Sequence, residues 1–75
     1  MNETLAEIIA DIFFLEENEV TMELTPEDVG LWDSLNHLRL VTAVESAFDI
    51  KLTMSEIQSI DKIAKLDELV SRHTG

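Results

Sequence analysis

The sequence predicts an all-α protein with four helices, one of them short, and a long loop after the first helix. Apolar residues recur at the three- and four-residue spacing of amphipathic helices in three segments. Two Thr-x-x-Glu patterns, Thr4–Glu7 and Thr53–Glu56, match the capping box that opens a helix. The length of 75 residues suits one domain, so residues 1–75 are expected to form a single helical bundle.

The first helix is expected at about residues 3–15, with Thr4 as its cap. One apolar stripe defines it: Leu5, Ile8, Ile9, Ile12 and Phe13. Residues 16–33 then form an acidic connection that is longer than most loops in compact domains, so we expect local structure within it. The segment 25–28, Thr-Pro-Glu-Asp, predicts one helical turn, with Val29 or Leu31 pinning the loop to the core.

The second helix is expected to start at Asp33 or Ser34 and to run to about Phe48. Leu40 is placed outside its apolar seam, which consists of Leu35, Leu38, Val41, Val44 and Phe48.

Two shorter helices close the predicted bundle. The pattern at Thr53 opens a helix that carries Ile57. Asp61 or Ser59 is expected to cap the last helix. Its buried stripe is Ile63, Leu66, Leu69 and Val70.

The charge of the chain restricts its partners. Sixteen acids against five bases give a net charge of −11 at pH 7. Such a charge repels nucleic-acid phosphates and anionic membrane surfaces, so neither is an expected partner. A basic protein surface is expected instead, because opposite charges steer encounter. No apolar stretch is long enough for membrane insertion. The lack of cysteine fits a reducing compartment such as the cytoplasm, where we expect a monomer.

Catalytic and metal sites are not predicted. Ser34 and His37 lie three residues apart on one predicted helix, so their side chains can meet. A catalytic site also needs an orienting group and oxyanion donors around a pocket, and the sequence offers no such set. His37 is therefore expected to face solvent. The acidic loop lacks the ligand pattern of a calcium site.

The segment around Ser34 carries the strongest signal for function. Taken alone, Asp33 or Ser34 before an apolar helix is typical of an N-cap. However, residues 30–35 read Gly-Leu-Trp-Asp-Ser-Leu, and Phe48-Asp49 follows about fourteen residues after the serine. Apolar residues at Leu38, Val41, Val44, Ile50, Leu52, Ile57 and Ile60 complete the pattern. Over nearly the whole chain this pattern resembles the acyl carrier protein family, in which Asp-Ser-Leu begins the second helix.

The resemblance implies a role for each matching residue. Ser34 would be esterified to 4′-phosphopantetheine by a separate phosphopantetheinyl transferase that uses coenzyme A and Mg²⁺. Asp33 and Leu35 would flank it as recognition contacts. The thiol of the arm would hold acyl groups as thioesters for fatty-acid, polyketide or related lipid synthesis, and the carrier itself would catalyse nothing. The other implied partners are acyl-loading and acyl-transfer enzymes with basic docking patches.

The resemblance also implies a place for the acyl chain between helices. The expected lining is Leu38, Val41, Ile57, Ile60 and Ile63. Ordinary core packing is the alternative role for these residues. A phosphodiester on Ser34 suits a helix N-terminus, because free N–H groups and the helix dipole favour an anion there.

The sequence departs from the family on the expected docking face. Asp33 and Glu45 keep its acidic character, whereas Asn36, Arg39 and Ser46 stand where acids are common. The reversed charge at Arg39 suggests a dedicated partner and a specialised pathway, or else a neutral surface substitution. Trp32 stands where small residues are frequent, and is expected to be buried with its indole N–H bonded.

Three alternatives to acyl transport remain open at this point. The first is a carrier for an activated amino acid. The second is an unmodified acidic helical adaptor that binds a basic protein. The third is a small hydrolase that uses Ser34 and His37.

Overall fold

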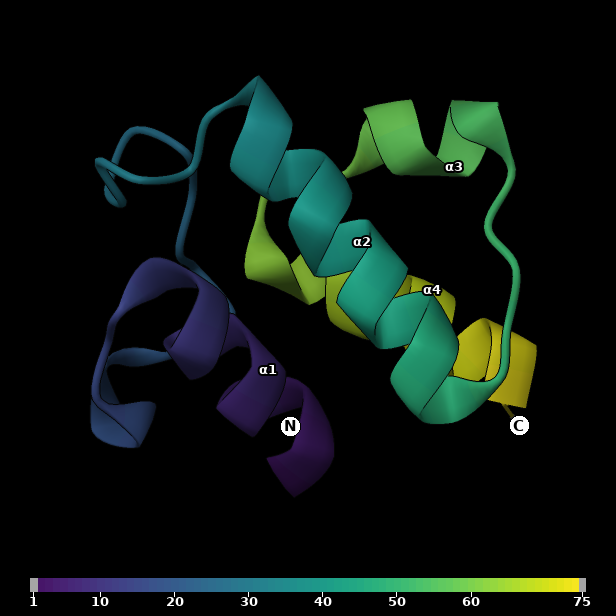
Figure 1. The fold of residues 1–75 in the computed structure, drawn as a ribbon, viewed down its shortest axis with the longest axis horizontal. Coiled ribbons are helices and arrows are strands. Elements are labelled where there is room, and N and C mark those ends of the chain that lie inside the picture. Colours follow the sequence, from purple (N-terminus) through teal and green to yellow (C-terminus); the bar gives the residue numbers. More distant parts are fainter. Residues whose placement is uncertain (1, 75) are drawn as a thin grey trace.

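The computed structural model describes residues 2–74 and has the predicted all-α architecture (Figure 1). Its four α-helices and one 3₁₀ turn are α1 (Glu3–Phe13), η1 (Glu17–Glu19), α2 (Ser34–Phe48), α3 (Met54–Ser59) and α4 (Ile63–Thr74). No residue from 2 to 74 lies in a strand, and no helix of this part of the chain is long and apolar enough to cross a membrane. The short third helix and the long first loop match the prediction.

The ends of α1 differ from the prediction. The Asn2 side chain accepts from the amides of Thr4, at 2.8 Å, and Leu5, at 3.3 Å. The capping box predicted at Thr4 is therefore wrong, because Asn2 supplies the acceptor and Thr4 lies inside the first turn. The helix ends at Phe13 because Phe14 adopts the left-handed conformation, with φ 56° and ψ 45°. The Leu15 amide then donates to the Ala10 carbonyl at 2.9 Å, which closes the last turn.

The first loop contains the predicted turn and the unforeseen η1. The Asp28 amide donates to the Thr25 carbonyl at 3.0 Å, and the Thr25 hydroxyl donates to the Asp28 carboxylate at 3.1 Å. Val29 is 5% exposed and Leu31 is 43% exposed. Of these two residues, Val29 is therefore the one that pins the loop to the core.

The first loop also caps α4. The amides of Ile63 and Ala64 donate to the carbonyls of Leu24, at 3.0 Å, and Met22, at 2.9 Å. The cap predicted at Asp61 or Ser59 is therefore wrong, and the Ser59 hydroxyl donates to the Glu56 carbonyl instead. The first amides of a helix can bond to a side chain or to a backbone carbonyl, and here the carbonyls of the first loop are the acceptors.

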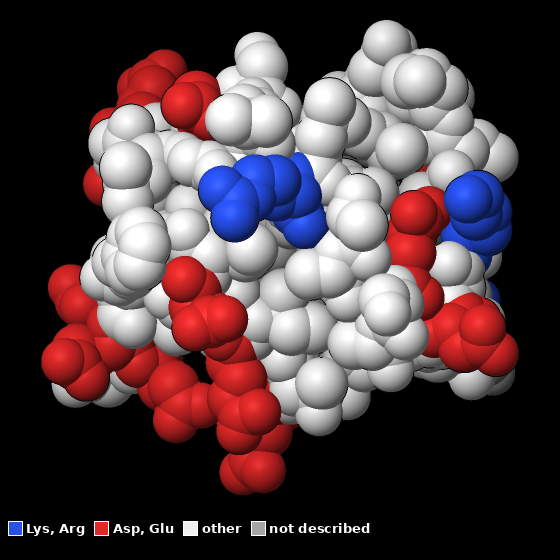
Figure 2. Space-filling model, in the orientation of Figure 1, with Lys and Arg blue, Asp and Glu red and all other residues white. Residues whose placement is uncertain are grey.

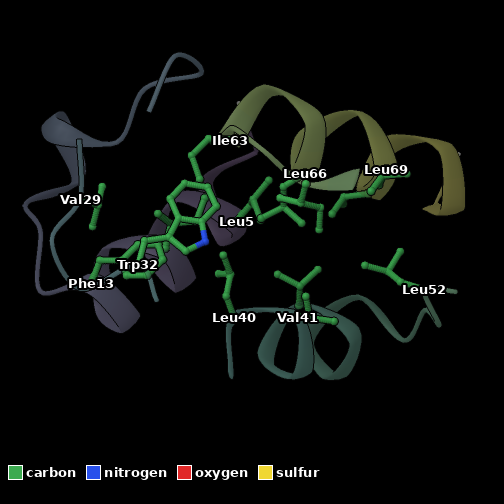
Figure 3. Packing of buried hydrophobic residues seen from close by; sticks show 14 residues of the cluster. Leu5, Phe13, Val29, Trp32, Leu40, Val41, Leu52, Ile63, Leu66 and Leu69 are labelled. Carbon is green, nitrogen blue, oxygen red and sulfur yellow. The ribbon is translucent and has the colours of Figure 1, made fainter. Parts of the chain in front are cut away.

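The core lies among α1, α2 and α4 (Figure 3). The helix α2 turns Leu40, which is 0% exposed, toward this core. Leu35 and Leu38 are 65% and 54% exposed. The predicted seam was therefore wrong at these three residues. The buried residues of α2 are Leu40, Val41 and Val44. They are buried because the face that carries them meets α1 and α4.

Polar contacts and the half-buried Ile57, which packs against the core, hold α3. The predicted capping box is confirmed: the Thr53 hydroxyl accepts from the Glu56 amide at 3.1 Å, and the Glu56 carboxylate accepts from the Thr53 amide at 2.9 Å. The same carboxylate lies 2.9 Å from His73 Nε2 on α4. The Thr53 amide and the His73 ring hold the pKa of Glu56 below its ordinary value of 4.5. No residue of α3 is fully buried.

Candidate functional site

Ser34 is the first residue of α2 and is exposed. Asp33 precedes it as the cap, and its Oδ1 accepts from the Asn36 amide at 2.8 Å. Within residues 2–74 the Ser34 hydroxyl has no hydrogen-bond partner. The structure thus separates two roles that the sequence left open: Asp33 satisfies the helix end, and the serine hydroxyl faces solvent.

The loop before Ser34 is held in place by backbone contacts. The amides of Trp32 and Asp33 donate to the carbonyls of Val29 and Leu31, each at 3.0 Å. The Asn36 side chain donates to the Leu31 carbonyl at 2.7 Å. Sequence reasoning placed Asn36 on the docking face and missed this bracing role. These contacts fix the direction from which the chain enters α2.

A hollow of about 560 Å³ opens beside Ser34, between α2, α3 and the first loop. Its size is within the range of small-molecule clefts. The lining residues are Pro26, Trp32, Asp33, Ser34, His37, Leu38, Met54, Ile57 and Gln58. The lining is mostly apolar, so the hollow suits an apolar group attached near Ser34.

The predicted acyl lining is divided between this hollow and the core. Leu38 and Ile57 line the hollow. Val41, Ile60 and Ile63 belong to the buried core cluster behind it.

Trp32 and His37 form a polar chain across the base of the hollow. The buried Trp32 indole donates from Nε1 to His37 Nδ1 at 2.8 Å, which confirms the predicted burial and bonding of the tryptophan. His37 Nε2 lies 2.9 Å from the Ile57 carbonyl on α3. The solvent-facing position predicted for His37 is wrong, because His37 continues the buried stripe of Leu40 and Val41. Leu40 and Val41 follow His37 at the three- and four-residue spacing of one helix face, and this spacing could have predicted from the sequence that His37 faces inward.

The contacts of His37 bear on the hydrolase alternative. Both ring nitrogens are engaged, one by Trp32 and the other by the Ile57 carbonyl. Neither nitrogen is left to accept a proton from Ser34, so the pair lacks the hydrogen bond that an activated serine needs.

The four predicted docking residues have different surroundings. Asp33 caps α2, Asn36 braces the loop, and the Glu45 carboxylate accepts from the Leu52 amide at 2.8 Å. Arg39 is exposed and forms no ion pair within residues 2–74. Figure 2 shows basic side chains beside the first turns of α2, while acids gather on the side of α1 and the first loop.

A helical bundle that displays a serine at the start of α2, with an apolar hollow beside it, is of the carrier type. No protein-family model matches the chain. The chain is 32% identical over 75 residues to an acyl carrier protein of Clostridium perfringens, covering 99% of this chain and 97% of that protein. It is 30% identical over 73 residues to that of Clostridium acetobutylicum, covering 96% and 94%.

A solved structure agrees with these relatives. The holo acyl carrier protein of Geobacter metallireducens superposes with a TM-score of 0.84 at 28% identity, over 95% of this chain and 82% of that chain. The chain therefore belongs to the acyl carrier protein family. Proteins of this family are carriers rather than enzymes.

Proposed function

We propose that the chain carries acyl groups on a 4′-phosphopantetheine arm attached to Ser34, for fatty-acid, polyketide or related lipid synthesis in the cytoplasm. The observation that carries this proposal is the exposed hydroxyl of Ser34. It has no hydrogen-bond partner within residues 2–74, because Asp33 caps the helix in its place. The solved relative is described as a holo acyl carrier protein, which supports the same modification here.

The residues around Ser34 fit such an arm. The first turn of α2 favours an anion, because the helix dipole and unpaired amides lie there. Leu35 is exposed next to the serine and, with Asp33, offers a contact to the transferase. When bound, the arm supplies a thiol that holds the acyl group as a thioester. Leu38 and Ile57 of the hollow would contact the cargo first, and Val41, Ile60 and Ile63 would contact a chain that goes deeper.

The mass of the protein tests this proposal. We expect one phosphopantetheine arm to be added when the protein is incubated with coenzyme A, Mg²⁺ and a promiscuous phosphopantetheinyl transferase. Intact mass spectrometry measures the addition, and a digest assigns it to the peptide that contains Ser34. An unmodified chain would contradict the proposal and favour the acidic adaptor. Turnover of an ester substrate that is lost in His37→Ala would favour the hydrolase.

Arg39 is proposed to select the partner enzymes. The transferase and the acyl-loading and acyl-transfer enzymes are expected to meet the acidic side of the carrier with basic patches. Arg39 places a positive charge on α2, which would match an acid on a dedicated partner and repel a basic patch. The pathway is therefore proposed to be a specialised one.

Reversing this charge should change partner choice. Arg39→Glu is expected to lower the kcat/KM of the cognate acyl-transfer enzyme for the acylated carrier by about tenfold or more, because like charges would then face each other. Use by fatty-acid synthase enzymes should rise. Lys51→Glu is the matched control, since it reverses an exposed charge outside α2. Unchanged kinetics with both kinds of enzyme would contradict the role of Arg39.

A further inference from the structure

The geometry points to His37 as a gate that keeps the acyl chain in the hollow beside Ser34 and out of the core, so that the carrier holds short acyl groups. This inference rests on the proposed function, because it concerns the cargo of the arm on Ser34. It assigns His37 a role in cargo selection through its bonds to Trp32 and Ile57.

The two hydrogen bonds define the state of the imidazole ring. The indole of Trp32 can only donate, so His37 Nδ1 must accept at 2.8 Å. The hydrogen of the neutral ring is then on Nε2, which donates to the Ile57 carbonyl at 2.9 Å. The two rings are nearly coplanar, with planes 18° apart and centroids 6.1 Å apart, as a bond between their edges requires. His37 is thus held from two sides, and its second bond joins α2 to α3.

The bond from His37 to Ile57 lies in the wall of the hollow. His37 lies one turn after Ser34, and Val41 lies one turn further along the same face. Both residues of the bond line the hollow, whereas Val41 and Ile60 do not and belong to the buried core. A chain that leaves Ser34 in the hollow therefore contacts His37 and Ile57 before it can reach Val41 and Ile60.

The space on the two sides of the bond differs. The hollow beside Ser34 is lined by His37 and Ile57 themselves and by Leu38, Met54 and Gln58. On the far side, Val41, Ile60 and Ile63 are packed in the core and at most 5% exposed. A chain that passes His37 must therefore displace packed side chains as well as break the hydrogen bond. A short acyl group can remain in the hollow without doing either.

The gate can open because α3 is lightly held. None of its residues is fully buried, and Ile57 is the residue of α3 that packs, half-buried, against the core. Its side-chain and carbonyl bonds to the other helices are those of Ile57 with His37 and of Glu56 with His73. Segments with few buried contacts open at a low free-energy cost. Removing the bond at His37 should therefore admit longer chains, at the expense of the selectivity for short ones.

The test is a series of saturated acyl groups, from acetyl to dodecanoyl, loaded on the arm of the wild-type protein and of two variants. Intact mass first verifies each acylated form, and the melting temperature is then measured by circular dichroism. A ligand that binds only the folded state raises the melting temperature, so this quantity reports how much of the chain is buried.

In the wild-type protein the melting temperature should stop rising within the short members of the series. His37→Ala removes both bonds, and its melting temperature should keep rising by roughly 3–6 °C for each further methylene that is buried. His37→Gln keeps an acceptor for Trp32 and a donor for Ile57, and should restore the wild-type pattern. A merely structural role of His37 would lower all melting temperatures without changing their dependence on chain length.

Each outcome decides the inference. A wild-type melting temperature that rises through dodecanoyl overturns it, and this measurement needs no variant to fold. A plateau in His37→Ala like that of the wild type, or a loss of the plateau in His37→Gln, also overturns it. If no arm is attached to Ser34, intact mass shows this before any melting temperature is measured. That result overturns the proposed function together with this inference.

Discussion

Replacing Ser34 with alanine is expected to abolish phosphopantetheine loading and to leave the stability of the fold nearly unchanged. The hydroxyl is the proposed point of attachment, so its loss leaves no acceptor for the arm. Because Asp33 is the cap of α2, and Ser34 has no hydrogen-bond partner within residues 2–74, the free energy of unfolding should change by only about 0.5 kcal/mol or less. Intact mass and urea unfolding measure the two quantities.

Two matched variants make this prediction specific. Asp33→Ala removes the cap and should lower the free energy of unfolding by about 1 kcal/mol. Ser59→Ala removes another serine on a helix, whose hydroxyl donates to the Glu56 carbonyl, and should load normally. Loading of Ser34→Ala would place the arm elsewhere. A large loss of stability in Ser34→Ala would show that the serine is a structural cap after all.

The second large effect is expected at Leu40. Leu40→Ala should lower the free energy of unfolding by about 2–5 kcal/mol, because the side chain is fully buried between α2 and the rest of the core. A domain of 75 residues has only about 4–11 kcal/mol of stability, so this variant should be close to unfolding at physiological temperature. Urea unfolding followed by circular dichroism measures the difference.

Leu38→Ala is the matched control, two residues away on the same helix. Leu38 is more than half exposed, so its truncation should cost about 0.5 kcal/mol or less. The periodic seam predicted from sequence would give the reverse order of effects, with Leu38 costly and Leu40 tolerant. Equal losses for both variants would contradict the orientation of α2 described above.

The candidate site was predictable where it depends on residues close together in the chain. Asp33, Ser34 and Leu35 are consecutive, and the helix start that presents the serine follows from a cap and the apolar residues after it. The contacts that complete the site were not predictable in this way. Asn36 braces a loop carbonyl, and His37 bridges Trp32 to a carbonyl twenty residues further along the chain.

By itself the sequence determined four helices, the start of the second one at Asp33 or Ser34, the capping box at Thr53 and the candidate serine. Each of these rests on interactions within one helical turn, which short patterns encode. Only the tertiary structure decided that Leu40 rather than Leu38 faces the core, and that backbone carbonyls of the first loop cap α4. The physical reason is that periodicity marks an apolar stripe but leaves its edges undefined, and the positions of the neighbouring elements select which side chains and carbonyls are brought together.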